Sequence, residues 1–190
     1  MSTLVVATSA ADAQAVEAIK DHHSQLAGAL AVQVETLIDA AVRADSSGAG
    51  LASKSLVSWC QSELIPHALA EERTLYPKAH EDSQARLLVD AMIAEHRDIL
   101  ALVEAIGAAQ TPVRAAANAQ ALLSIFNSHL VKENEQILPL LARSSAVSLA
   151  ALLGGMHELL GDPAADMSSE GGCGGDCTCC EQDLVGVLPE

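Results

Sequence analysis

A pattern that occurs twice constrains the fold of this chain more than any other feature. His67-Ala-Leu-Ala-Glu71 and His129-Leu-Val-Lys-Glu133 each place a glutamate four residues after a histidine, and in both copies a proline follows ten residues after the histidine. Residues i and i+4 of an α-helix lie one above the other on the same face. Each copy therefore predicts a helix that presents one imidazole and one carboxylate to a single point.

Two further histidines alternate with this motif. His23 precedes the first copy and His96 precedes the second, so the order is His, His-x3-Glu, His, His-x3-Glu. Imidazole nitrogen suits iron, zinc and copper, and a carboxylate can bridge two cations. The order predicts two half-sites of one metal centre. The alternative, in which these histidines are ordinary core residues, would leave several buried polar groups without a partner, at roughly 1–3 kcal/mol each.

The apolar pattern selects which histidine of the first helix faces inward. His23 lies seven residues after Val16 and three before Leu26, along an apolar stripe, whereas His22 is rotated by about 100°. Histidine 96 follows the stripe of its own helix in the same way. The predicted inward-facing set is His23, His67, Glu71, His96, His129 and Glu133.

Composition favours an all-α chain. Half of the residues are hydrophobic but only 2% are aromatic, so the core must be built from Leu, Ala, Val and Ile, and Ala and Leu are strong helix formers. Asp45–Gly50 is expected to be a loop, and Pro66 is expected to kink or unwind the second helix just before its ligand pair. The spacing predicts helices over 13–43, 53–78, from a cap at 81–83 to 107, from a cap at 111–112 onward, and 146–160.

Long amphipathic helices with short connections predict an up-down-up-down four-helix bundle. The expected organisation is a disordered N-terminus at 1–12, the metal-binding bundle at 13–142, an additional short helix at 143–160, and a disordered acidic Gly/Cys-rich tail at 161–190. Ser144-Ser145 is expected to cap the additional helix.

The formal net charge of −15 argues against nucleic acid or an anionic membrane as a partner, since both favour basic surfaces. The chain shows no basic leader and no uninterrupted apolar stretch of about 18 residues. We therefore expect a cytoplasmic protein whose thiols are reduced.

The quoted motifs resemble those of hemerythrin-like proteins of the bacterial His/His-Glu cation-binding type, over about residues 13–142. The resemblance rests on Asp21-His22-His23, Leu64-Ile-Pro-His67 through Glu72, Ala94-Glu95-His96-Arg97, and the second His-x3-Glu copy. It implies a non-haem centre of two iron ions, which can share an oxo or hydroxo bridge and bind dioxygen, nitric oxide or peroxide. The four inward histidines would be terminal ligands, and Glu71 and Glu133 would bridge.

The chain departs from the oxygen-carrying members at one place. Those proteins carry a second histidine four residues from the first on the third helix, whereas here Met92 and Leu100 stand at these positions. Fewer protein ligands make the two metals nearly equivalent and leave more positions open to a small ligand. This favours peroxide turnover or gas sensing over reversible oxygen carriage. Glu72 and Tyr76 are additional candidate ligands; alternatively, Glu72 is a solvated neighbour and Tyr76 a capping residue.

The tail contains a second chemical motif, four thiols within eight residues. Thiolates bind zinc and soft metals, but the spacing is not a repeated Cys-x2-Cys pair. A thiol or metal role and a non-specific tail both remain open for Cys173, Cys177, Cys179 and Cys180.

These observations lead to three hypotheses. The first is a di-iron protein that binds or reduces dioxygen, nitric oxide or peroxide; whether it is an enzyme is left open. The second is a non-enzymatic iron or oxygen sensor, or an iron-storage module, whose cysteine tail binds metal or a partner. The third is a helical interaction domain with structural histidines.

Overall fold

The computed structural model describes residues 7–160, and this part of the chain is helical throughout apart from short turns, which confirms the all-α class. The four tail cysteines lie outside the described residues. The α-helices are α1 (Ala10–Val42), α2 (Ser46–Trp59), α3 (Ile65–Arg73), α4 (Leu75–His80), α5 (Arg86–Gly107), α6 (Pro112–Lys132), α7 (Leu138–Arg143) and α8 (Leu149–Leu160), and two π-helical turns are η1 (Cys60–Leu64) and η2 (Glu133–Ile137).

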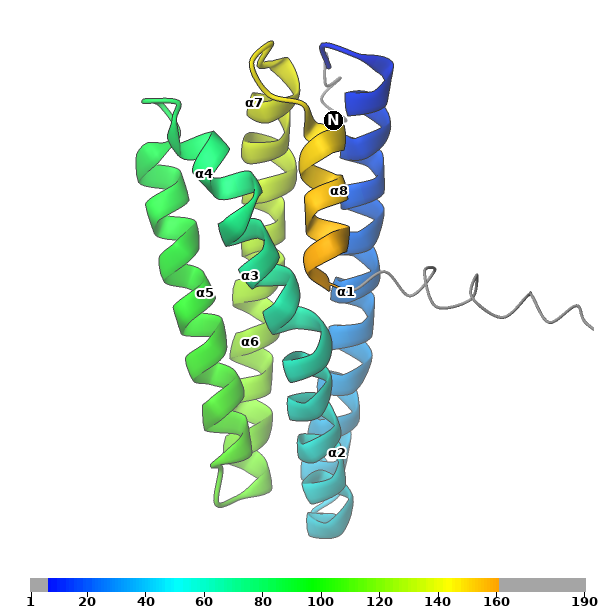
Figure 1. The fold of residues 1–190 in the computed structure, drawn as a ribbon. Coiled ribbons are helices and arrows are strands. Elements are labelled where there is room, and N and C mark those ends of the chain that lie inside the picture. The colour runs from blue at the N-terminus through cyan, green and yellow to red at the C-terminus, as the bar shows by residue number, and fades with distance from the viewer. Residues whose placement is uncertain (1–6, 161–190) are drawn as a thin grey trace, which may run out of the picture.

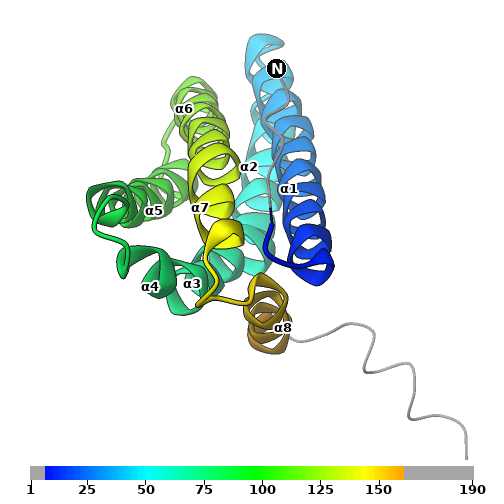
Figure 2. The ribbon, with the colours of Figure 1, turned by 90° about the horizontal axis from the view of Figure 1, so that it is seen from above.

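The long helices lie side by side and enclose a common interior (Figure 1). Helix α1 packs against α2 and α6, and α5 packs against the same two helices from the other side. The short α8 packs on the outside, against α1 and α3, as the view from above shows (Figure 2). Every side chain of the candidate site comes from the enclosing helices.

The buried side chains form two apolar clusters, one toward each end of the interior. One contains Leu26 of α1 and Ile99 of α5, and the other contains Ile19 of α1 and Met92 of α5. Each of these helices passes from one cluster to the other within seven residues, and its histidine, 23 or 96, lies between them. The polar residues of the site therefore occupy a layer between two apolar layers.

Side-chain caps determine where the first helix begins. The Ser9 hydroxyl accepts a hydrogen bond from the backbone N–H of Asp12, and α1 begins at Ala10, three residues earlier than the apolar spacing indicates. The buried Asp12 carboxylate also accepts from the backbone N–H of Ala150, at 3.1 Å. This contact fastens the start of α8 to the start of α1.

The expected loop over Asp45–Gly50 is wrong, because α2 begins at Ser46. The chain reverses over Arg43–Asp45 alone, and the Asp45 carboxylate accepts from the backbone N–H of Gly48 at 2.9 Å. A Cβ at residue 48 would collide with that carboxylate, so a glycine here makes room for the cap. The Ser and Gly residues that suggested a loop are in fact a helix start.

Two other expected caps lie elsewhere. The Asp82 carboxylate accepts from Gln84 within a turn, and α5 begins only at Arg86. The last helix begins at Leu149, where the Ser148 hydroxyl accepts from Ala151, so the cap expected at 144–145 is wrong. By contrast, the expected cap and first-turn proline of α6 are both present at 111–112.

A π-helical turn precedes each of two prolines. In η1 the backbone N–H of Ile65 donates to Cys60 O, and Pro66 follows; in η2 the N–H of Leu138 donates to Glu133 O, and Pro139 follows. Proline lacks an N–H and its ring crowds the carbonyl four residues earlier, which a wider turn relieves. The expected local unwinding at Pro66 is confirmed, and the second widened turn begins at a candidate ligand.

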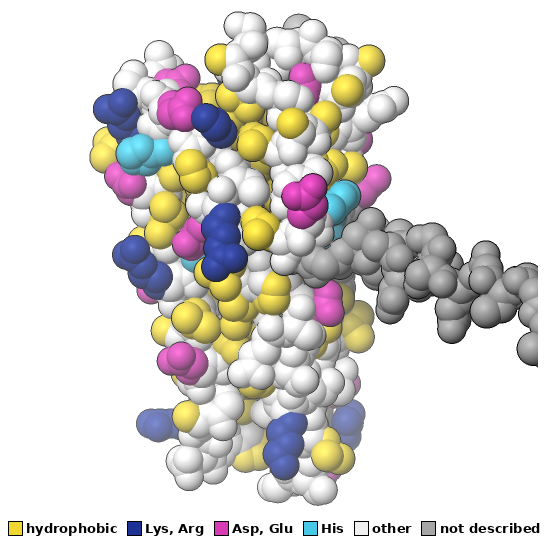
Figure 3. Space-filling view, viewed as in Figure 1, with side chains coloured by type: hydrophobic (Ala, Val, Ile, Leu, Met, Phe, Trp, Pro, Cys, Tyr) yellow, Lys and Arg dark blue, Asp and Glu magenta, His cyan; other side chains and the backbone are white. Residues whose placement is uncertain are grey.

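The surface mixes charged and apolar side chains. On the face seen in Figure 3, acidic and basic groups are interspersed with small groups of hydrophobic side chains. Among the described helices, α1 is long and apolar enough to cross a membrane, by length and composition only. Core helices of soluble proteins share that composition, and the apolar stripe of α1 is buried against its neighbours.

The reversal after α1 generates a stability prediction. Ala44 has φ 56°, and its N–H donates to Ala41 O while the next N–H donates to Ala40 O. This left-handed position normally carries glycine, because a Cβ there costs roughly 1–2 kcal/mol. A44G removes this strain, but glycine also gains conformational freedom in the unfolded chain, which offsets part of the stabilisation. The net effect should be a free energy of unfolding of the metal-free protein that is higher by about 0.5–1 kcal/mol, measured by urea titration.

The matched control is A121G, at an exposed position inside α6. There the same substitution should lower the free energy of unfolding by about 1 kcal/mol. A loss of similar size in both variants would contradict the assigned backbone at Ala44.

Candidate metal centre

The six predicted inward-facing residues converge in the polar layer. All are buried, and the two carboxylates are at most 1% exposed. Their helices are α1 for the first histidine, α3 for the first His-x3-Glu copy, α5 for the third histidine, and α6 with η2 for the second copy. The structure brings together His23, His67, Glu71, His96, His129 and Glu133.

The Glu71 carboxylate lies between two pairs of histidines. Its Oε1 is 3.3 Å from His23 Nε2 and 2.8 Å from His67 Nε2, and its Oε2 is 3.6 Å from His96 Nε2. Two groups of three potential ligands result, with their donor atoms within 4.8 Å of one another: the first is His23, His67 and Glu71, and the second is Glu71, His96 and His129. One carboxylate is therefore shared by two potential cation positions.

Glu133 joins the same two groups from the opposite helix. Its Oε2 lies 3.7 Å from His23 Nε2 and also 3.7 Å from His129 Nε2. Both Glu133 oxygens are buried and neither has a hydrogen-bond partner in the described part of the chain. An orphaned buried carboxylate is costly unless a cation neutralises it.

Three of the histidines are oriented by hydrogen bonds on their outer ring nitrogens. In each case an oxygen acceptor faces Nδ1, so Nδ1 carries the proton and donates, and Nε2 keeps its lone pair. The three contacts are His23 Nδ1 with Asn134 Oδ1 at 2.8 Å, His96 Nδ1 with Glu72 Oε1 at 2.8 Å, and His129 Nδ1 with Glu95 Oε2 at 3.0 Å.

With these tautomers, the Nε2 lone pairs point toward one another and toward carboxylate oxygens. His96 Nε2 and His129 Nε2 are 3.1 Å apart, and the other neighbours of the Nε2 atoms include carboxylate oxygens. Acceptor atoms at such distances repel unless protons or cations lie among them. Inward-facing imidazole nitrogens and carboxylate oxygens, with the Tyr76 hydroxyl as a neighbouring donor beside His96 and His129, are the donor set of a first-row transition metal site. The arrangement therefore fits cations at the centre.

The two carboxylates differ in their affinity for protons. Burial raises the pKa of Glu71, but the nearby His67 and His23 more than offset this and hold its pKa well below the usual range. Burial and the adjacent charge of Glu71 raise the pKa of Glu133 well above its usual value. Two carboxylates this close and this buried cannot both be ionised without compensating positive charge.

Tyr76 lies inside the centre. The side chain is 1% exposed, and its hydroxyl is 3.1 Å from His129 Nε2 and 3.5 Å from His96 Nε2. Burial and the charges of Glu71 and Glu133 raise the pKa of the phenol, so the hydroxyl keeps its proton and can donate. The alternative in which Tyr76 is a capping residue is wrong; the hydroxyl lies beside the second group of ligands.

Glu72 does not contact the Nε2 atoms that face the centre. Its carboxylate accepts a hydrogen bond from His96 Nδ1 and so orients that ring, which a simple solvated neighbour would not do. Glu95 and Asn134 act in the same way on their own histidines, and neither was predicted. The available signal was adjacency: Glu95 precedes His96, and Asn134 follows Glu133. Lys132 forms an ion pair with Glu95, which holds that carboxylate in place and, with His129, lowers its pKa despite burial.

Beside the centre is a small cavity of about 100 Å³ between α1, α3 and α8. His67 contributes to its wall, and the ring centroids of His22 and His67 are 4.9 Å apart. Within the described residues, His67 Nδ1 is buried and has no hydrogen-bond partner. The cavity is lined by Ala18, Ile19, His22, His67, Leu153, Met156 and His157.

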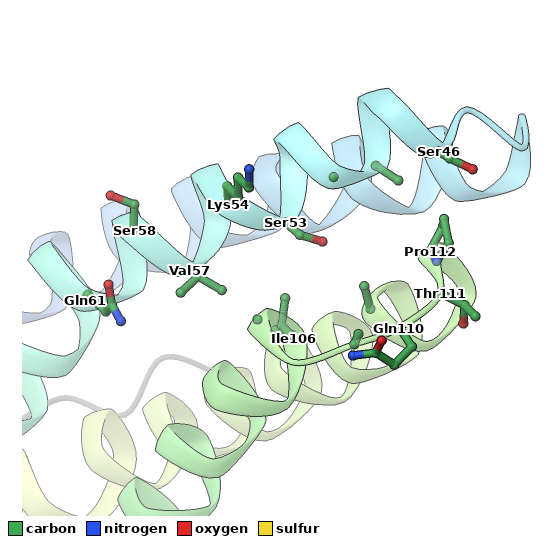
Figure 4. Close-up of a pocket in the computed structure, with 15 residues that line it drawn as sticks. Ser46, Ser53, Lys54, Val57, Ser58, Gln61, Ile106, Gln110, Thr111 and Pro112 are labelled. Carbon is green, nitrogen blue, oxygen red and sulfur yellow. The ribbon is translucent and has the colours of Figure 1, made fainter.

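A larger pocket of about 520 Å³ lies between α2 and the turn that joins α5 to α6 (Figure 4). Lys54, Ser53 and Gln110 line it together with apolar side chains such as Val57 and Ile106. None of the residues that line it belongs to the histidine and glutamate cluster. This pocket is therefore separate from the candidate metal centre.

The comparison with known families agrees with the site. The chain matches the hemerythrin HHE cation-binding domain over residues 14–141, which is more than half of its length. The chain belongs to this hemerythrin family of cation-binding domains. No match was found among the curated proteins or among the solved structures. Helix α8 lies outside the matched residues.

The histidine that faces away from the centre generates a pH prediction. Burial is the main cause that lowers the pKa of His22 from 6.5 to about 4, and the electrostatic effect of the neighbouring His67 and His23 acts in the same direction. Between pH 6.5 and pH 4, His22 is protonated in the unfolded chain but remains neutral in the folded protein. The free energy of unfolding is therefore highest above pH 6.5 and decreases as the pH falls toward 4. The free energy of unfolding of the metal-free H22Q variant should depend less steeply on pH in this window, by up to about one proton.

Urea titrations across the window measure this slope. H80Q, which removes a half-buried histidine of α4 outside the polar layer, is the control. An unchanged slope in H22Q relative to wild type would show that His22 titrates normally in the folded protein.

Proposed function

We propose that the chain is a non-haem di-iron protein, built on an up-down-up-down four-helix bundle, that binds or reduces a small oxygen or nitrogen species such as dioxygen, nitric oxide or peroxide. The observation that carries the proposal is the pair of three-residue groups that share Glu71. The two oxygens of Glu71 would both act as ligands only if each of the two groups holds a cation. A single cation would leave one group of lone pairs facing one another.

The chain's own residues would hold the ions in two nearly matched sets. His23 and His67 would ligate the first ion, and His96 and His129 the second. Glu71 would span them through its two oxygens, and Glu133, equidistant at 3.7 Å from one histidine of each set, would be the second bridge. Two carboxylates reduce the net charge of such a cluster, which a buried site requires.

The surrounding residues would position the ligands and exclude water. Asn134, Glu72 and Glu95 hold three imidazoles with Nε2 inward, and apolar layers close both ends of the polar layer. When bound, a pair of iron ions would supply open coordination positions and one-electron redox chemistry toward a small ligand.

The two positions are not fully alike. The Tyr76 hydroxyl lies beside the second set only, where it can donate a hydrogen bond or occupy a ligand position. Because its raised pKa keeps the phenol protonated, the hydroxyl can donate a hydrogen bond to a small ligand beside the second set. This difference between the two sets favours turnover of peroxide, because a peroxide oxygen at the second set can accept that hydrogen bond.

The second candidate function is a non-enzymatic iron or oxygen sensor. It is favoured by the departure on α5, where Met92 and Leu100 stand at the two positions four residues from His96, and by the additional helix α8, which packs against α1 and α3. A sensor binds the same ions but does not consume peroxide.

Metal content tests the proposal directly. Protein purified from iron-supplemented cells should contain about two iron per chain by elemental analysis. Because both positions share Glu71, the E71A variant should retain about one iron or fewer. E104A, which removes an exposed glutamate of α5, should retain the wild-type content. Full iron content in E71A would show that this carboxylate is not shared.

Peroxide consumption separates the two functions. We expect the iron-loaded protein to remove hydrogen peroxide, and the metal-free protein and E71A to lose this activity. Y76F should retain the iron but consume peroxide more slowly, because the hydrogen-bond donor beside the second set is absent. Iron-loaded protein that binds nitric oxide or azide yet leaves peroxide intact would favour the sensor.

A further inference from the structure

His67 differs from the other three site histidines. Nothing within the described residues accepts a hydrogen bond from its Nδ1, although the side chain is only 2% exposed. Its Nε2 lies 2.8 Å from Glu71 Oε1 but is not hydrogen-bonded to it. The tautomer of His67 is therefore left open by the protein groups, whereas an oxygen acceptor sets it for each of the others.

The small cavity lies against this ring. Its volume is about 100 Å³, well above the roughly 10–15 Å³ that a cavity needs to hold one water molecule. Ile19 and Met156 form buried apolar walls, while the half-buried His22 and the exposed His157 supply further polar groups beside His67. Ala18 is exposed and lies at the rim, so the cavity communicates with the surface between α1 and α8.

We propose that this cavity is a water site, in which an ordered water accepts a hydrogen bond from His67 Nδ1 and is held by His22. The water occupies the place that Asn134, Glu72 and Glu95 occupy for the other histidines. A neutral imidazole offers one donor and one acceptor, and either can bind water. An unpartnered buried N–H costs roughly 1–3 kcal/mol, which the water relieves. His22 is thereby a positioning residue for His67.

Helix α8 encloses the site. It supplies the Met156 wall and lies outside the residues that match the family. The Asp12 carboxylate, which accepts from the backbone N–H of Ala150, fixes its start against α1. The second partner of His67 therefore depends on an element added to the cation-binding domain.

A crystal structure of the full chain that resolves ordered water tests the first part, with or without metal. We expect a water at about 2.7–3.2 Å from His67 Nδ1. A dry cavity, or a protein side chain on Nδ1, would overturn the proposal.

Metal affinity tests the positioning role, and this part rests on the proposed function. Iron(II) is titrated against a competing chelator in H22L, in H22N, and in the control H80L. Loss of an outer hydrogen-bond partner typically costs 10–100-fold in affinity. H22L should lose about that factor for one of the two ions, and H22N, which keeps polar groups beside the cavity, should stay close to wild type.

N134L provides the benchmark, because it removes the direct partner of His23. If H22L binds both ions as tightly as H80L, His22 does not position His67. If the wild-type chain binds no iron(II) at all, the proposed function fails, while the crystal structure still decides whether the water is present.

Discussion

Acceptor atoms that face one another inside the protein are the constraint on which the rest of the structure depends. Three imidazoles donate outward through Nδ1, so their Nε2 lone pairs point at each other and at two carboxylates. Such a cluster is unfavourable in isolation and favourable around cations. The His-x3-Glu motif supplies the atoms, and the outer hydrogen bonds force their orientation. The role of the family domain in binding cations follows from this geometry.

The apolar layers and the prolines make the cluster possible. Leu26 and Ile99 lie on one side of it and Ile19 and Met92 on the other, so water is excluded along the helix axes. The π turns before Pro66 and Pro139 alter the rotation of the following residues about the helix axis, close to the candidate ligands of α3 and η2. Widened turns of this kind are frequent at functional sites. Here each one follows from a proline that the sequence already displays.

Much of this could be predicted from spacing. Periods of three and four residues place His23 and His96 on buried stripes, and the i, i+4 rule places each glutamate beside its histidine. Those rules concern one helix at a time. What they cannot predict is a contact between helices, such as Asn134 with His23 or Glu95 with His129, because these depend on the rotation of neighbouring helices.

The errors have local physical causes. Ser46–Gly50 has the composition of a loop, but a single carboxylate at Asp45 caps it into a helix. The capping role considered for Tyr76 placed its hydroxyl at a helix end, yet the side chain is buried and the hydroxyl lies beside His129. In both cases one side-chain contact outweighs a compositional tendency. The cavity behind His67 had no sequence signal, since it is formed by α8 returning to α1.

X-ray absorption spectroscopy of the iron-loaded chain tests the central claim most directly. If Glu71 and Glu133 both join the two groups of ligands, the spectrum should show a second iron at about 3.5–4 Å or less from the first, within a shell of nitrogen and oxygen ligands. Iron that is bound with no neighbouring iron, or in a shell without imidazole nitrogen, would contradict the account of a shared carboxylate between two histidine pairs.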